Sequence, residues 1–285
     1  MLNPTESIHH DNVSVLSARD PDCSGFFPTG FEDLYEVHSY RNAVRILKSA
    51  CKTEFDELVE TLMAFRIATE QMVKKGGNKS LIAKNMDDVM HPRGWAETRV
   101  QADLLIKQIT AAPVARVMKS GVRKGQTVYE NVKCEEMSML KGFIDGHKID
   151  FIKGRVAFDL EWNSKDQTFD RDLYAARTFY ECGVITAGVL LTRSSLLIPL
   201  FAEIGNRVNI PNYKSKFGAS TTWMGKLTYR LDAGRGGGCP ILALGIKPGV
   251  VDDFDAWKAT HEVIREVDFE VSETDGASDE AEDES

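Results

Sequence analysis

Residues 148–163 constrain the fold most, because their side chains alternate between apolar and polar with the period of a β-strand. Within them, Gly154-Arg155 fits a two-residue hairpin turn, whose first position requires the positive φ that glycine adopts readily. The stretch therefore predicts a hairpin whose second strand is half-buried. One face of that strand carries Val156, Phe158, Leu160 and Trp162, and the opposite face carries Ala157, Asp159, Glu161 and Asn163.

The register of this hairpin sets two carboxylates against each other. The turn pairs Phe151 with Phe158 and places Asp150 directly opposite Asp159. Opposed like charges are unfavourable unless a cation or a raised pKa offsets the repulsion. Oxygen-only ligands favour a hard cation such as Mg²⁺, which indicates phosphodiester hydrolysis. The alternative is a hairpin whose acids face solvent or pair with Lys148 and Arg155.

The acids form the pattern Asp-x8-Asp-x-Glu, from Asp150 through Asp159 to Glu161. This pattern resembles the metal-binding hairpin of the PD-(D/E)xK nucleases, most of which have Lys at the last position. Glu or Gln there is typical of the BamHI and BglII group of type II restriction endonucleases. Further matches to the BglII-type family are Arg171-Asp172-Leu173, residues 188–193 and residues 216–223. The resemblance covers approximately residues 76–250 and implies an α/β fold with a mixed central sheet flanked by helices.

The resemblance also implies roles for individual carboxylates. Asp150 would be the bridging Mg²⁺ ligand, Asp159 the second ligand, and Glu161 the group that orients or deprotonates the attacking water. In this group a further acid comes from a helix before the hairpin, which corresponds here to Glu135 or Glu136. Because the usual Lys is missing, three lysines are candidate substitutes for its charge: Lys148, Lys153 and Lys165.

Two basic or hydroxyl-rich segments are candidates for DNA contact. In residues 212–223, lysines can neutralise phosphates and hydroxyls can read base edges near a helix start. Residues 76–80 form a second candidate phosphate-binding loop. The alternatives are an ordinary helix N-cap with surface lysines in the first segment and a plain helix stop in the second. The candidate DNA-binding residues are Lys79, Asn163, Lys214, Lys216, Ser220, Thr221 and Thr222.

The charge distribution is compatible with a nucleic-acid partner despite a net charge of −8. Residues 268–285 hold nine acids and no base, so the rest of the chain carries +1. This tail is expected to be disordered, either as a solubilising end or as a competitor of DNA for basic groups. Five widely spaced cysteines and the lack of a long apolar run predict a cytoplasmic protein with free thiols and no membrane contact.

The chain is expected to form one nuclease domain, residues 1–267, followed by the acidic tail. Its helical N-terminal portion is placed at about 37–112 from the hydrophobic periodicity. The resemblance implies a catalytic core at about 130–250. Helices are expected from Phe55 to the glycines at 76–77 and over 96–109, 170–181 and 255–267. Buried strands are expected over 184–192 and 240–246.

Taken with the resemblance, these features predict a Mg²⁺-dependent type II restriction endonuclease. A homodimer acting on double-stranded DNA with a palindromic site follows from one active site per strand. The family implies a cognate DNA methyltransferase as a genomic companion. Two alternatives are a structure-specific repair or recombination nuclease and a catalytically inactive DNA-binding protein of the same fold.

Overall fold

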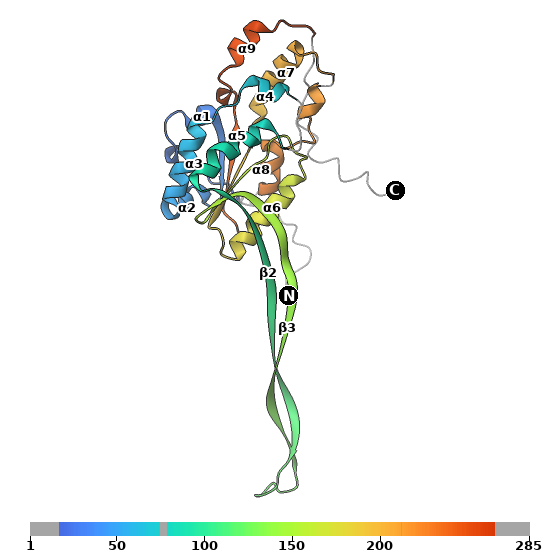
Figure 1. Ribbon diagram of the computed structural model, residues 1–285. Coiled ribbons are helices and arrows are strands. Elements are labelled where there is room, and N and C mark those ends of the chain that lie inside the picture. The colour runs from blue at the N-terminus through green and yellow to red at the C-terminus, as the bar shows by residue number, and fades with distance from the viewer. Residues whose placement is uncertain (1–16, 75–78, 212, 266–285) are drawn as a thin grey trace, which may run out of the picture. The chain divides into compact units, whose positions relative to one another are not determined.

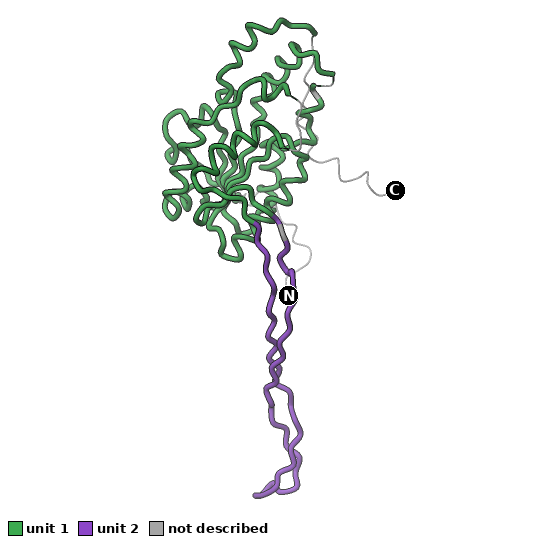
Figure 2. Tube along the Cα trace, in the orientation of Figure 1, with its two compact units in different colours: residues 1–98, 148–285 green, residues 99–147 purple. Residues whose placement is uncertain are grey.

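The computed structural model describes residues 17–74, 79–211 and 213–265 (Figure 1). The chain divides into two compact units, coloured separately in Figure 2. Unit 1 contains the residues up to 98 and from 148 onward, and unit 2 contains residues 99–147. The acidic tail at 268–285 lies outside the described residues. No helix in the described part of the chain has the length and apolarity that a bilayer crossing requires.

A mixed six-stranded sheet has the strand order β1-β6-β5-β4-β3-β2. The pairs β4–β5 and β5–β6 are parallel, whereas β1–β6 and β3–β4 are antiparallel. The predicted mixed α/β organisation is therefore confirmed. The strands are β1 (Tyr35–Tyr40), β2 (Ala96–Val117), β3 (Thr127–Lys153), β4 (Val156–Leu160), β5 (Ala187–Arg193) and β6 (Ile241–Ile246).

Helices cover both faces of the sheet in unit 1 (Figure 1). Val189 of β5 belongs to the main apolar core together with Val44 of α2. Its neighbour Gly188 points the other way, where a Cβ atom would lie 3.7 Å from that of Ala176 in α6. The helices are α1 (Phe31–Leu34), α2 (Ala43–Ala50), α3 (Lys52–Ala64), α4 (Thr69–Val73), α5 (Leu81–Met90), α6 (Thr168–Glu181), α7 (Ile198–Arg207), α8 (Met224–Asp232) and α9 (Phe254–Thr260).

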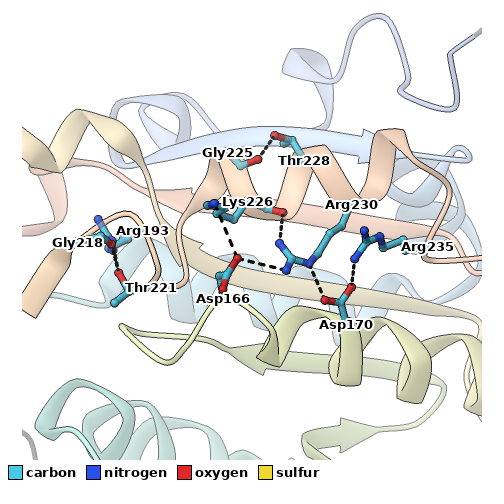
Figure 3. A network of polar contacts seen from close by, with 10 residues as sticks. All are labelled: Asp166, Asp170, Arg193, Gly218, Thr221, Gly225, Lys226, Thr228, Arg230 and Arg235. Atoms are coloured by element: carbon cyan, nitrogen blue, oxygen red, sulfur yellow. Dashed lines mark hydrogen bonds and ion pairs between the residues drawn. The ribbon is translucent and has the colours of Figure 1, made fainter. Parts of the chain in front are cut away.

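An ion-pair network joins α8 to the beginning of α6 (Figure 3). Arg230, only 6% exposed, lies 3.0 Å from Asp170 and 3.3 Å from Asp166. Arg235 lies 2.6 Å from the other Asp170 oxygen. A buried guanidinium needs carboxylate partners, and its planar fork can bind two of them. The network therefore fixes where α6 begins relative to α8.

Several predicted elements are wrong in type or extent. Residues 96–109 form part of strand β2, because a short apolar run can satisfy either period and here a distant partner strand selects the extended form. The helix expected from Phe55 breaks at Phe65, whose extended backbone separates α3 from α4. Helix α6 begins at Thr168, two residues before the expected start at 170. Helix α9 ends at Thr260, before the expected end at 267.

Unit 2 is a two-stranded ribbon formed by β2 and β3, and nearly all of its described side chains are solvent-exposed. Ion pairs connect the two strands: Arg99–Asp145 at 2.9 Å, Lys107–Glu135 at 2.7 Å and Arg116–Glu130 at 3.2 Å. Partners whose numbers rise on one strand and fall on the other show that the strands run antiparallel.

Candidate active site

The hairpin of β3 and β4 has the predicted register. Phe151 pairs with Phe158 and Lys153 with Val156, which leaves Gly154 and Arg155 as the turn. Gly154 has φ of 54°, the positive value that the turn was expected to require. The stacked rings of Phe151 and Phe158, with centroids 5.5 Å apart, anchor the hairpin on the core side. The turn and the apolar face together set the register that positions the acids.

Asp150 and Asp159 meet as the register predicts. The backbone N–H of Asp150 donates to Asp159 Oδ1 at 2.6 Å. However, β4 is buried along its whole length, and Asp159 is only 8% exposed. The expected half-buried strand is therefore wrong, because β4 is an interior strand with side chains packed over both of its faces. The carboxylates consequently sit in a less solvated environment than a surface hairpin would provide.

Glu161 follows the end of β4 and is held there by β5. Its backbone N–H donates to Leu191 O at 2.9 Å, and its carbonyl accepts from Thr192 Oγ1 at 2.9 Å. The Glu161 side chain is 12% exposed, and its Oε1 lies 3.7 Å from Arg171 Nη2. Burial raises the pKa of Glu161, and the hydrogen bond with the Ser164 hydroxyl partly opposes this rise. The backbone is thus fixed at the site, and one neighbouring cation faces the carboxylate.

Asp172 of α6 is a buried acid to which the sequence assigned no role. It is 3% exposed, and its Oδ2 has no hydrogen-bond partner among the described residues. Its Oδ1 lies 3.1 Å from Arg171 Nη2. Burial and then the charge of Glu161 raise the pKa of Asp172 to about 8. The sequence could have indicated this residue, because Asp172 is an acid on the apolar face of α6 that also carries Phe169, Leu173 and Ala176.

Burial raises the pKa values of the acids in the site, and neighbouring carboxylates add to the rise at Asp159. Burial, followed by the charges of Asp172 and Asp150, raises the pKa of Asp159 well above its ordinary value. Burial also raises the pKa of Asp150, and the positive charges of Lys79 and Arg171 oppose that rise. Buried carboxylates with few cationic partners are costly unless a proton or a metal neutralises them.

The donor set fits a hard cation in chemistry and in charge. All candidate ligands are carboxylate oxygens, which Mg²⁺ prefers, and Asp172 Oδ2 is a buried acceptor without a partner among the described residues. Among those residues, no group of three or more His, Cys, Asp or Glu side chains converges as a complete metal cluster. Carboxylates of Asp150 and Asp159 would leave coordination positions of Mg²⁺ for water and phosphate oxygens.

Two of the lysines considered as substitutes for the missing Lys are engaged elsewhere. Lys148 pairs with Glu97, and Lys153 lies 2.8 Å from Glu57. Lys165 forms a backbone bridge with Thr221. The cation that faces Glu161 is Arg171, which the sequence had shown only as part of a family match. The sequence did not reveal this pairing, because Arg171 lies on α6, beyond the loop that follows the hairpin, and only the fold brings it close to Glu161.

Glu135 and Glu136 do not lie on a helix. Both lie on strand β3 within unit 2, where Glu135 Oε2 is 2.7 Å from Lys107 Nζ. The expectation of a helix failed because the strands of the ribbon extend over this whole segment. Adjacent residues of a strand point to opposite faces, so the two acids still cannot share one role.

Buried Arg193 organises the loop predicted to contact DNA. Its guanidinium donates to Thr222 O at 3.0 Å, to Phe217 O at 3.2 Å and to Thr221 Oγ1 at 2.5 Å, and Figure 3 shows the Thr221 end of this arrangement. Thr222 is fully buried, with its hydroxyl accepting from Ser164 N at 3.1 Å. The Thr222 hydroxyl therefore ties this loop to the segment after Glu161 and is not presented to solvent.

The other candidate DNA-binding residues differ in accessibility. Ser220 is exposed, whereas Lys216 Nζ donates to Met72 O and Lys74 O, each at 2.6 Å. Lys214 lies in the 3₁₀ segment Tyr213–Phe217, and its side chain is outside the described part.

Asn163 and Lys79 lie on other segments of unit 1. Asn163 has φ of 62°, and its Oδ1 is buried without a partner in the described residues. Lys79 lies 2.5 Å from Asp87 and precedes Ser80, whose side chain caps α5 by accepting from Ala83 N. Residues 76–78 of the candidate phosphate loop are outside the described range.

Comparison with known families identifies the family of the chain. The family model described as restriction endonuclease BglII/BglIII matches residues 35–246, a span that runs from the start of β1 to the end of β6 and includes the hairpin. A search of curated proteins gives no match. Because the family model covers well over half of the sequence, the chain belongs to the BglII/BglIII family of restriction endonucleases.

Proposed function

We propose that this chain hydrolyses phosphodiester bonds in double-stranded DNA at a specific palindromic sequence, with Mg²⁺ as cofactor. The observation that carries the proposal is the contact between Asp150 and Asp159 on the β3–β4 hairpin, with Glu161 two residues further along. Membership of a restriction endonuclease family supports the choice of DNA and of a site-specific reaction.

Asp150 and Asp159 would hold Mg²⁺ through carboxylate oxygens. When bound, Mg²⁺ would stabilise negative charge on the scissile phosphate and lower the pKa of a coordinated water. Glu161 would orient that water and accept its proton, a role that its raised pKa favours because a stronger base takes up a proton more readily. Arg171, 3.7 Å from Glu161, would hold the carboxylate in place and replace the positive charge that Lys gives in related nucleases.

We infer a homodimer because one such site cuts one strand, and a two-fold protein matches a two-fold sequence. Ser220, Lys214, Lys216, Thr221, Asn163 and Lys79 remain the candidates for DNA contact, and both Ser220 and Lys79 are exposed. A methyltransferase that protects the same sequence would accompany the enzyme in its genome.

Digestion of a long DNA tests this proposal. Wild-type protein with Mg²⁺ should produce discrete, reproducible fragments whose ends share one palindromic sequence, and Asp150→Asn should produce none. Cleavage wherever the DNA is branched or mismatched, without a shared sequence, would instead indicate a structure-specific nuclease. Intact DNA with both Mg²⁺ and Mn²⁺, together with retained DNA binding, would indicate an inactive DNA-binding protein.

A further inference from the structure

The ribbon of unit 2 ends in a turn whose charge differs from that of its shaft. We define the tip as residues 118–126 and the shaft as residues 99–117 and 127–147. The shaft holds five Lys or Arg and five Asp or Glu, so its formal charge is zero, whereas the tip holds three basic residues and no acid. These three are Lys119, Arg123 and Lys124. The net positive charge of the ribbon therefore lies at its tip.

Three of the five shaft cations form ion pairs. In the shaft, Arg99, Lys107 and Arg116 each pair with an acid on the other strand, at distances of 2.9 to 3.2 Å for the two arginines and 2.7 Å for the lysine. In the tip, no ion pair is found for any of the three cations within the described part of the chain, and all three side chains are exposed. Paired charges on the shaft are largely neutralised locally, so the tip retains its attraction for an anion.

The tip has a defined backbone that presents these side chains outward. Met118 N donates to Gln126 O at 3.0 Å and Gly125 N donates to Met118 O at 2.8 Å, which closes the turn. Gly121 and Gly125 have φ of 82° and 86°, values that side chains other than glycine rarely adopt. Val122 between them is fully exposed. An apolar residue presented among three cations is suited to a surface with phosphates beside apolar groups.

We propose that the tip of the ribbon is a DNA-binding element that contacts backbone phosphates through Lys119, Arg123 and Lys124. A two-stranded β-ribbon fits into a groove of B-DNA, where phosphates flank apolar sugar and base surfaces that Val122 can contact. The inference rests on the proposed action on DNA, and it adds a phosphate-binding element on unit 2. Contacts of this kind raise affinity for all sequences and position the duplex, without reading the bases.

The test compares two triple variants by DNA binding without Mg²⁺, so that no cleavage occurs. In the tip variant, Lys119→Gln, Arg123→Gln and Lys124→Gln remove three unpaired cations. In the matched shaft variant, Arg99→Gln, Lys107→Gln and Arg116→Gln remove the same charge from paired positions. Fluorescence anisotropy of a labelled duplex is measured between about 50 and 200 mM salt, the range over which phosphate contacts change affinity strongly.

Loss of three phosphate contacts should lower the slope of log affinity against log salt by about 2.7, since each contact contributes about 0.9. Between about 50 and 200 mM salt, the wild-type affinity should then fall about 40-fold more than that of the tip variant. The shaft variant should keep a slope close to that of wild type. Alkylation of Val122→Cys, followed by mass measurement of its peptide, should be slowed by added duplex.

An unchanged slope in the tip variant would overturn the inference, as would equal slopes in both variants. A tip variant that binds DNA as wild type does but dissociates into smaller species on sedimentation would also overturn it, because the tip would then contact a second copy of the chain. Failure of the proposed hydrolysis is a separate outcome, since wild-type protein that never cleaves DNA can still show the slope difference.

Discussion

Replacing Asp159 with Asn should stabilise the protein when Mg²⁺ is absent. Asp159 is 8% exposed, and its pKa is raised by burial and by the charges of Asp172 and Asp150. The folded protein therefore binds this proton more tightly than the unfolded chain does, and stability is lost as the pH rises from the ordinary value of 3.8 towards the folded pKa. Asn removes the ionisation while its amide oxygen can still accept from Asp150 N.

The size of the effect follows from the linkage between pKa and stability. Each unit of raised pKa corresponds to about 1.4 kcal/mol that the ionised group costs the fold. The unfolding temperature of Asp159→Asn should therefore rise by several degrees, because about 1 kcal/mol shifts the midpoint of a chain of this size by 2–4 °C. Calorimetry at pH 7 measures this gain. At about pH 3.5 the wild-type carboxyl is largely protonated in both states, and the gain should be nearly absent.

Two comparisons make this prediction specific to the site. Mg²⁺ should raise the unfolding temperature of wild type more than that of Asp159→Asn, because binding to the folded state stabilises it. Asp56, whose pKa is lowered by hydrogen bonds from Lys48 and Lys52, serves as the control. Asp56→Asn should leave stability unchanged or lower it. The reasoning is refuted if Asp159→Asn melts at or below the wild-type temperature at pH 7 in the absence of metal.

Two further substitutions test how neighbouring residues position the hairpin and its acids. Arg171→Gln should lower the cleavage rate about 10-fold or more while DNA affinity changes little, because Glu161 loses its facing cation. The control Arg177→Gln, on the same helix but paired with Glu181, should cleave normally, and equal rates for both variants would argue against the role of Arg171. Gly154→Ala should destabilise the protein by about 1–2 kcal/mol from backbone strain, and slightly more because the Glu54 carboxylate, whose Oε1 would lie 2.3 Å from the new Cβ, must move aside. Gly234→Ala has a similar positive φ and open space around it, so urea unfolding should show a smaller loss for this control.

The hairpin was predictable from the sequence because its information is local. Period-two alternation, one glycine in the turn and a matching pair of phenylalanines define the register without reference to the rest of the chain. The burial of β4 was not predictable in this way. Asp159 is covered because β5 pairs alongside and α6 packs over the sheet, and both are placed by contacts between distant segments.

The surroundings of the acids show the same limit. Asp172 and Arg171 reach Glu161 from α6, whose position depends on the ion pairs of Arg230 with Asp166 and Asp170. No spacing in the sequence encodes that approach. The helix expected at Glu135 was wrong because the sequence there follows neither the helical nor the strand period of apolar residues clearly. An exposed ribbon does not need a consistent apolar face. A helix transferred by resemblance was then placed on a segment that is extended here.

The cleavage rate of Asp150→Asn on the recognised DNA tests the central claim most directly. The hairpin carboxylates are proposed to act in hydrolysis and not to contribute to DNA affinity. The single-turnover cleavage rate with Mg²⁺ should therefore fall by at least ~10²-fold. Affinity without metal should be equal to or tighter than that of wild type, because a negative charge near the scissile phosphate is removed. A variant that binds the DNA and cleaves it at a near-normal rate would show that the active site lies elsewhere in the chain.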